Sequence, residues 1–370
     1  MRLKLERRLV LTGRDAVKIS IYSIIATFVI FSILLMLTEV WNEKEQKWER
    51  VNPLEAYKEI FSFAFDPEFG LGLTIRRGML LLFATLAFIL PLRAGIWNIG
   101  GEGQFYLGTV GAFGVAYALS DLPSGALIPL MLIASALCGA GYGAITGYLK
   151  ARLNVNEIVL AIMLNNIAYW LIHFLIVGGP WMGTAESVSK PLPVSARAPM
   201  IWEVPFTIFL VLAISVLLYF LLTKFKIGYQ IRALGHNPAA AKYAGMSPLK
   251  ISLFVMTVGG AIAGIAAYHL WAGDPGFYMI PKPQSYQQQG QFMYYGIICG
   301  LICVLNPIAA IPTAIFISGM TVGSGTGLIS RLGLGFGIDF AFLGILFLTF
   351  VAFQFFHQYR IVRVKKTRMR

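Results

Sequence analysis

The chain has 370 residues, of which 57% are apolar and only 13% are charged, and its formal net charge is +13. A soluble domain carries about 25% charged residues because its surface must be hydrated, so this composition excludes an ordinary soluble protein. The basic residues lie in short segments between apolar runs and not on one amphipathic face, which argues against nucleic-acid binding. We therefore expect a polytopic α-helical protein in contact with membrane lipids.

Ten apolar runs approach the roughly 20 residues that a helix needs to cross a bilayer. They cover residues 19–40, 78–97, 103–120, 125–148, 157–177, 205–223, 250–271, 290–305, 307–323 and 337–357. The first run is longer than the apolar core of a cleavable signal peptide, so we expect it to remain as a spanning helix. The sequence thus predicts an all-α fold with about ten transmembrane helices in a single domain, 1–370.

Lysine and arginine predict the orientation, because they concentrate on the cytoplasmic side of a membrane protein. If both termini are cytoplasmic, 20 of the 30 basic residues fall in inner segments. This orientation makes 1–18 a cytoplasmic basic leader and 358–370 a cytoplasmic basic tail. It also places the 224–250 loop in the cytoplasm and the 41–77 segment outside. Within the external segment, Pro53 to Phe65 alternates apolar and charged residues at helical spacing, as in a helix lying on the outer leaflet.

Two short matches indicate an inverted repeat of five plus five spans. The third run opens with Gly103-Gln104-Phe105 and the eighth with Gly290-Gln291-Phe292. Likewise, Ala126-Leu127-Ile128-Pro129 begins the fourth run and Ala310-Ile311-Pro312 lies in the ninth. Copies that are five spans apart have opposite orientations, as in many transporters. Chance similarity between short apolar stretches is the alternative.

The segment from Arg93 to Gln104 interrupts the apolar pattern with four glycines, an asparagine and a carboxylate. Glycine permits backbone turns that are closed to other residues, and non-helical backbone at membrane depth must line a cavity or be covered by protein. One interpretation is a re-entrant elbow whose Asn98, Glu102 and Gln104 belong to a substrate pathway. The alternative is a tight cytoplasmic turn in which Glu102 caps the next helix.

Asn165 and Asn166 lie one to two helical turns inside the fifth run. Side-chain amides in lipid need hydrogen-bond partners and therefore usually face the interior of a helix bundle. The two asparagines either belong to the substrate pathway or tie helices together, and the second role is the more common one.

Small residues predict a packing face on the fourth run, where Gly139, Gly143 and Gly147 recur every four residues. This spacing lets two helix backbones approach each other closely. The three cysteines contain no CxxC pair and the four histidines are scattered singly, so the sequence predicts no metal site.

The longest expected inner loop, 224–250, carries the signals of a short helix at about 238–244. Asn237 is a good N-cap and Pro238 suits the first helical position. Gly245 suits the C-terminal stop, and Pro248 follows three residues later. A single short helix is therefore expected to project into the cytoplasm. The loop is either a basic connection without further function or the carrier of a docking helix for a partner subunit.

At this loop the chain resembles the permease subunits of ATP-binding-cassette (ABC) importers, in the branch that serves ribose, other simple sugars and nucleosides. The similar residues are Arg232-Ala233-Leu234-Gly235-x-Asn237-Pro238-x-Ala240-Ala241-x-x-x-Ala244-Gly245-Met246. Asn156-Glu157-Ile158-Val159, Asn98-Ile99-Gly100-x-Glu102-Gly103-Gln104 and Asn306-Pro307 also resemble motifs of that branch. The resemblance covers residues 75–355, and branched-chain amino acid permeases are similar more distantly.

The resemblance implies a non-catalytic permease subunit of a prokaryotic cytoplasmic membrane that works by alternating access. It implies three partner proteins: a cytoplasmic ATPase subunit, a second permease that is homologous or identical, and an extracytoplasmic solute-binding lipoprotein. ATP and Mg²⁺ would be bound by the ATPase, because this chain has no GxxxxGK[ST] loop. The residues that the resemblance assigns to coupling with the ATPase are Arg232, Gly235, Asn237, Ala240, Ala241, Ala244 and Gly245.

Two other functions remain as alternatives to a sugar or nucleoside importer. An ion-coupled secondary carrier of a small polar solute would need a carboxylate inside the membrane, and Glu102 is the strong candidate. An ABC permease for branched-chain amino acids would share the architecture and differ in its solute. A membrane enzyme is disfavoured, because no cluster of acids, histidines or cysteines is evident near one leaflet.

Overall fold

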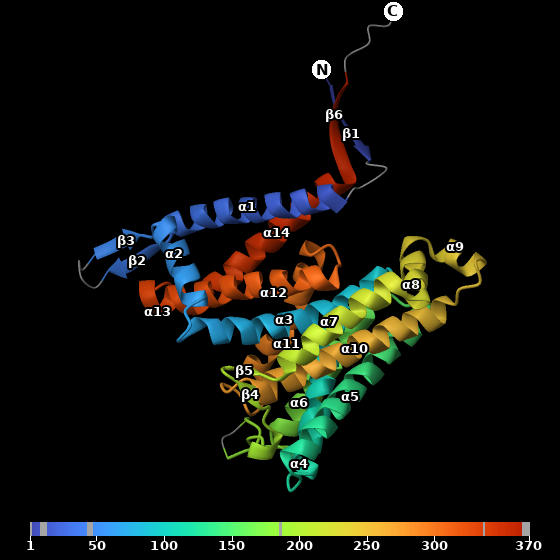
Figure 1. The fold of residues 1–370 in the computed structure, drawn as a ribbon. Coiled ribbons are helices and arrows are strands. Elements are labelled where there is room, and N and C mark those ends of the chain that lie inside the picture. The colour runs from blue at the N-terminus through green and yellow to red at the C-terminus, as the bar shows by residue number, and fades with distance from the viewer. Residues whose placement is uncertain (1, 8–12, 43–46, 185–186, 336, 365–370) are drawn as a thin grey trace, which may run out of the picture. The chain divides into compact units, whose positions relative to one another are not determined.

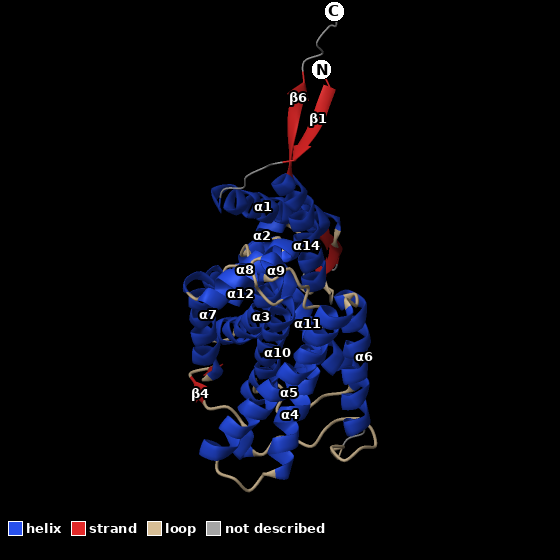
Figure 2. Cartoon of the chain, turned by 90° about the vertical axis from the view of Figure 1, so that its right-hand side faces the viewer, coloured by secondary structure: helices blue, strands red, loops and turns tan. Residues whose placement is uncertain are grey.

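The computed structural model of the chain describes residues 2–7, 13–42, 47–184, 187–335 and 337–364. Helices account for most of these residues, and the strands among them form three short two-stranded antiparallel pairs. The predicted all-α fold is therefore confirmed (Figures 1 and 2). The chain divides into two compact units, Ile75–Ser318 on one side and Met1–Thr74 with Gly319–Arg370 on the other. Helices α3 and α12 continue across the division, and the single-domain assignment stays a prediction.

The Ile75–Ser318 unit contains most of the candidate membrane-spanning helices. Its elements are α3 (Gly70–Arg93, from Ile75), α4 (Gly101–Ala118), α5 (Ser124–Leu153), α6 (Glu157–Ile176), the 3₁₀ turn η1 (Val194–Ala196), β4 (Met200–Ile201), β5 (Val204–Pro205), α7 (Thr207–Lys224), α8 (Lys226–His236), α9 (Pro238–Tyr243), α10 (Pro248–Gly273), α11 (Pro283–Ile302) and α12 (Pro307–Val322, to Ser318).

Helices α5 and α10 lie side by side and form the centre of this unit (Figure 1). Their backbones touch where Gly139 on α5 meets Gly260 on α10, because a Cβ added at Gly139 would collide with the Gly260 carbonyl oxygen. Gly143 and Gly147 lie in the same way against Met256. The predicted packing face on the fourth apolar run is therefore confirmed.

The second unit joins the two ends of the chain. Its elements are β1 (Arg2–Arg7), α1 (Gly13–Leu37), β2 (Glu39–Asn42), β3 (Lys47–Arg50), α2 (Pro53–Ala64), the π-helix η2 (Gly323–Gly327), α13 (Leu328–Leu332), α14 (Ile338–Gln358) and β6 (Tyr359–Val364). Helices α1 and α14 are joined by a buried contact of 2.6 Å between the hydroxyls of Thr27 and Thr349. The Arg331 guanidinium lies 2.8 Å from the Glu59 carboxylate, which ties α13 to α2.

Strand β1 pairs antiparallel with β6, from Arg2 opposite Val364 to Arg7 opposite Tyr359. The N-terminal and C-terminal segments therefore lie at the same end of this unit (Figure 1). This arrangement is compatible with the prediction that both termini lie on the same side of the membrane. The remaining parts of the basic leader and tail, residue 1, 8–12 and 365–370, lie outside the described residues. The helical pattern predicted within the external segment is confirmed by α2, and its position on a membrane surface stays a prediction.

Seven helical segments among the described residues are long and apolar enough to cross a membrane. They are Ser20–Leu37, Gly70–Arg93, Ser124–Leu153, Glu157–Ile176, Thr207–Lys224, Pro248–Gly273 and Pro307–Leu332. The other three predicted runs coincide with α4, α11 and α14, which are shorter or more polar. Exposed side chains on α6 and α7, such as Ile162, Met163 and Leu217, are apolar, as contact with lipid requires.

The last third of the chain departs from the predicted boundaries. Helix α11 begins at Pro283, seven residues before the predicted start of the eighth run, and α12 continues through η2 and α13 to Leu332. The proposed repeat aligns Gly103, near the start of α4, with Gly290, well inside α11. Pro129 and Pro312 do occupy equal places, each the sixth residue of its helix. The inverted repeat stays a prediction.

The contact of α5 with α10 is tested by a pair of substitutions on one helix. Gly139→Val inserts a branched side chain where no Cβ fits, and we expect a loss of about 3 kcal/mol of stability or no folded protein. Gly141→Val is the control, because nothing lies within 4 Å of a Cβ at Gly141. The thermal midpoint of the purified protein in detergent measures both variants, and equal midpoints would contradict the packing that we describe.

Candidate functional site

The connection between α3 and α4 turns back into the bundle. The Asn98 side-chain Nδ2 donates a hydrogen bond of 3.2 Å to the carbonyl of Ala87, six residues before the end of α3. Six residues of helix correspond to about 9 Å, so the connection runs back by that length along α3. Gly95 has a φ of +78° and lies against Gly235 of α8. The geometry is that of a re-entrant elbow.

Asn98 and Gln104 form a reciprocal pair of side-chain amides. Asn98 Nδ2 donates to Gln104 Oε1 at 3.0 Å, and Gln104 Nε2 donates to Asn98 Oδ1 at 2.9 Å. Both side chains are buried. Because a buried amide without partners is costly, this pairing stabilises the elbow at the beginning of α4.

Glu102 is a buried acceptor for two tyrosines from different helices. Its Oε1 accepts from the Tyr106 hydroxyl at 2.8 Å, and its Oε2 accepts from the Tyr294 hydroxyl on α11 at 2.8 Å. The N-cap of α4 is Gly100, without a side-chain hydrogen bond. Glu102 therefore connects α4 to α11 through Tyr294. It does not cap α4, because the N-cap position is Gly100.

Asn165 on α6 completes this cluster. Its Oδ1 accepts from the backbone N–H of Gly103 at 2.9 Å, and its Nδ2 lies 3.1 Å from the Tyr294 hydroxyl and 3.2 Å from the Ile99 carbonyl. The cluster of Glu102, Asn165 and Tyr294 thus connects α4, α6 and α11. Asn166 is different, because its side chain is exposed and its Nδ2 donates to the Ile162 carbonyl of its own helix.

Four of the five residues predicted for the pathway therefore gather around the beginning of α4, and Asn166 lies on the exposed face of α6. Sequence reasoning missed the partners Tyr106 and Tyr294. Tyr106 follows Glu102 by one helical turn, a spacing that predicts contact on a helix face. Nothing in the sequence connects Tyr294 with Glu102, 192 residues away.

Helix α8 packs against the part of the elbow that follows α3. A Cβ at Gly235 would collide with the carbonyl oxygen of Arg93, so the two backbones are in contact. The Arg93 Nη2 donates to the Leu305 carbonyl at 2.8 Å. Arg93 and Arg232 both line a cavity of about 250 Å³ beside the start of α12. This end of the unit therefore combines the ends of α3, α7 and α11 with the 224–250 loop.

The predicted helix in this loop is confirmed as α9. Asn237 Oδ1 accepts from the backbone N–H of Ala240 at 3.0 Å, which is an N-cap bond, and Gly245 has a φ of +77°. Ala241 is buried, whereas Tyr243 is 94% exposed. Most residues of α9 are therefore exposed, and the helix contacts α8 and α10.

The prediction of a single helix in this loop was wrong, because α8 precedes α9. Ile227, Ile231 and Leu234 recur at helical spacing, and Ile231 and Leu234 are buried. Gly228 and Gly235 interrupt this pattern in the sequence. Both fit because they allow close approach to the backbones of α7 and α3, which no larger residue would permit.

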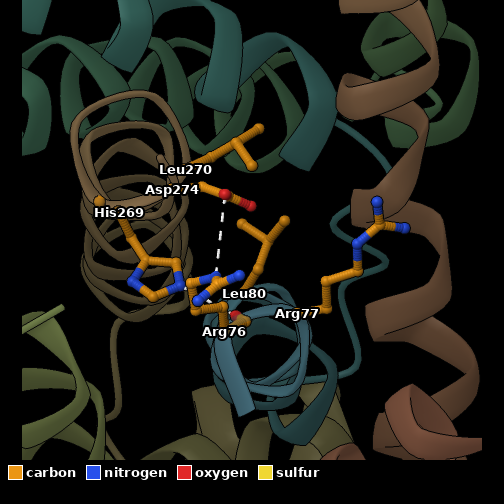
Figure 3. A pocket seen from close by; sticks show the side chains of 7 residues that line it. Arg76, Arg77, Leu80, His269, Leu270 and Asp274 are labelled. Carbon is orange, nitrogen blue, oxygen red and sulfur yellow. Dashed lines mark hydrogen bonds and ion pairs between the residues drawn. The ribbon is translucent and has the colours of Figure 1, made fainter. Parts of the chain in front are cut away.

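The opposite end of the unit carries a partly buried ion pair (Figure 3). Arg76 Nε lies 3.8 Å from Asp274 Oδ1, and His269 Nε2 lies 3.0 Å from the Arg76 carbonyl oxygen. Arg77 points away from Asp274. The cavity between these side chains measures about 10 Å³, which is the space of a single water molecule and not of a solute.

Comparison with known proteins places the chain in a transporter family. The family described as branched-chain amino acid transport system / permease component matches residues 70–351, and the chain belongs to this family. It is a multi-pass membrane protein and a permease component, not an enzyme. The match starts after the first 69 residues, in agreement with the range of the resemblance seen in the sequence.

Three relatives illustrate the similarity. The glucose ABC transporter permease protein TsgB13 of Haloferax volcanii is 30% identical over 329 residues, covering 84% of this chain and 83% of the relative. The nucleoside ABC transporter permease protein NupB of Lactococcus lactis is 28% identical over 288 residues, covering 74% and 77%. The putative glucose ABC transporter permease protein TsgC13 of Haloferax volcanii is 27% identical over 212 residues, covering 54% and 61%.

Removing one hydroxyl tests the cluster around Glu102. Tyr294→Phe leaves the ring in place but deletes the donor to Glu102, and we expect a loss of about 1–2 kcal/mol of stability. Tyr148→Phe on α5 is the matched control, because Tyr148 is half exposed. Thermal unfolding in detergent compares the variants. A Tyr294→Phe midpoint equal to that of the control would show that the cluster does not hold α4 to α11.

Proposed function

We propose that the chain forms the translocation path for a nucleoside or a simple sugar in an ABC importer. The description of its family names branched-chain amino acids, but of the three relatives described above two are named for glucose and one for nucleosides. The alignment with TsgB13, which is named for glucose, covers most of both chains. This similarity favours a hydroxyl-rich solute over an amino acid. Transport would proceed by alternating access, driven by ATP hydrolysis in a separate subunit.

The observation that carries this proposal is the exposed helix α9. The N-cap bond and the C-terminal glycine define the ends of this short helix, and contacts with α8 and α10 support it. Its exposed surface lies next to α8, whose backbone contacts the end of α3. A partner that pushed on α9 would therefore move a segment in direct contact with the elbow. We assign this surface to the cytoplasmic ATPase, which binds ATP and Mg²⁺.

Two further partners follow from the family. Haloferax volcanii has two permease proteins named for glucose that both match this chain, TsgB13 and TsgC13. This supports a second permease subunit that is homologous to the chain and not identical. An extracytoplasmic solute-binding lipoprotein would deliver the solute to the opposite end of the unit from α9.

The orientation and the number of spans belong to the same proposal. We place α8, α9 and both termini in the cytoplasm of a prokaryotic cell, with α4, α11 and α14 as additional spans for a total of ten. The excess of lysine and arginine in these inner segments supports this orientation. The adjacent strands β1 and β6 support a common side for the two termini.

The substrate pathway is proposed to pass the beginning of α4. Glu102, Asn165 and Tyr294 provide donors and acceptors at the meeting point of three helices, and Asn98 and Gln104 hold the elbow beside them. Asn166 lies on the exposed face of α6 with Ile162 and Met163, and its place in the pathway stays a prediction. The mutual hydrogen bonds of the cluster would have to exchange for bonds to the solute during transport.

Truncating the exposed ring of α9 tests the docking surface. We expect Tyr243→Ala to reduce co-purification of the ATPase by about tenfold, because exposed tyrosines are typical anchors of interfaces, without a change in thermal stability. Trp202→Ala is the control, since Trp202 is 97% exposed at the other end of the unit. Equal ATPase recovery with Tyr243→Ala and wild type would argue against docking on α9.

Cysteine labelling tests the orientation. In a background with Cys138, Cys299 and Cys303 replaced by serine, we expect Tyr243→Cys to react with a membrane-impermeant maleimide in inside-out vesicles and not in intact cells. Asp121→Cys, in the exposed turn between α4 and α5, should react in intact cells. The reverse pattern would invert the proposed topology.

A further inference from the structure

The first two turns of α11, which precede the predicted eighth run, carry exposed polar side chains. Gln284, Ser285, Gln287 and Gln288 are all exposed. Gln284, Gln287 and Gln288 are spaced at i, i+3 and i+4, so they share one face of the helix. We call these three residues the glutamine stripe. It was not recognised in the sequence, because the eighth run was predicted to begin only at residue 290.

The stripe lies at a depth within the helix bundle, near the C-terminal end of α10. The Tyr106 hydroxyl lies 3.4 Å from the Gln287 carbonyl, so these two residues are at the same level. Tyr106 precedes Thr109 by three residues, and Thr109 accepts a hydrogen bond of 2.9 Å from Trp271. Trp271 in turn precedes Asp274, at the end of α10, by three residues. Six residues of helix correspond to about 9 Å, which places Gln287 two turns inside the end of α10.

Contact with acyl chains does not suit this surface. The exposed faces of α6 and α7 carry side chains such as Ile162, Ile167 and Leu217. A glutamine amide has two N–H donors and an acceptor oxygen, and polar groups left without partners in hydrocarbon are costly. Three amides on one face therefore indicate water or a polar ligand on that side of α11, not lipid.

The stripe continues toward the cluster at the beginning of α4. Tyr294 follows Gln287 by seven residues, which places both on one face of α11, about 10 Å apart. Tyr294 is partly buried, and its hydroxyl donates to Glu102. Gly290, between them, is buried against Tyr106. A solute that moved from the glutamines to the tyrosine would therefore pass beside this contact.

We propose that the glutamine stripe of α11 is the polar wall at the outer entrance of the translocation path, where it hydrogen-bonds the hydroxyl groups of a sugar or of the ribose of a nucleoside. This inference rests on the proposed function and adds the residues that receive the solute. Glutamine amides both donate and accept, as does a hydroxyl, so each pair can exchange partners as the solute advances. Neutral amides also bind weakly enough for release.

Uptake by the intact transporter in its host cells tests the stripe. We expect the double variant Gln287→Leu, Gln288→Leu to lower the maximal uptake rate of radiolabelled uridine, ribose or glucose about tenfold, since two neutral hydrogen bonds are lost. The half-saturating concentration should stay unchanged, because a separate binding protein captures the solute. The Gln287→Asn, Gln288→Asn variant keeps both amides and should retain more of the rate.

Unchanged uptake by the leucine variant would overturn the role of the stripe while leaving the proposed function intact. If wild-type cells took up none of the three solutes in an ATP-dependent manner, the proposed solute class would fail instead.

A second measurement does not depend on the solute. In the cysteine-free background, Gln288→Cys should react with a water-soluble maleimide from outside, and Met163→Cys on the apolar face of α6 should not. An unreactive Gln288→Cys would place the stripe in lipid or in a closed interface and would overturn the inference.

Discussion

One serine hydroxyl at the crossing of three helices fixes the arrangement on which the rest of the Ile75–Ser318 unit depends. Ser135 Oγ on α5 lies 3.0 Å from the Gly108 carbonyl of α4 and 2.5 Å from the Gly264 carbonyl of α10, and its hydrogen is shared between them. This contact exists only because both partners are glycines, which leave their carbonyls accessible. In lipid, where the hydrophobic effect cannot press helices together, close packing and such hydrogen bonds take its place.

The elbow follows from this packing. Once α4 is held against α10, its beginning lies beside Gly259, whose missing side chain leaves room for the Asn98 amide. The connection from α3 must then turn back into the bundle to reach α4, and its polar groups require partners there. Asn98 and Gln104 bind each other, and Glu102 and Asn165 bind tyrosines and backbone. The same network thus satisfies buried polar groups and joins α4, α6 and α11.

The features that the sequence predicted well are those with a local physical cause. The cap of α9 depends on Asn237, Pro238 and Gly245 alone, and the glycine face of α5 depends on a spacing of four residues. The position of a helix at each of the ten apolar runs is likewise a matter of composition along a short stretch.

The features that were missed depend on residues far apart in the chain. The early start of α11 was hidden because its first two turns are polar, and hydropathy detects only apolar segments. The partner of Glu102 on α11 and the contact of α8 with α3 bring together segments separated by more than 130 residues. No local pattern encodes such a contact.

The strand pair formed by β1 and β6 has a consequence for how the protein is handled. Each six-residue strand satisfies its backbone groups through the other, so trimming one terminus exposes an unpaired edge on the opposite one. An affinity tag fused at either end will emerge on one common face, next to the other end. Deleting either strand therefore changes both terminal regions of the protein, because the remaining strand loses its partner.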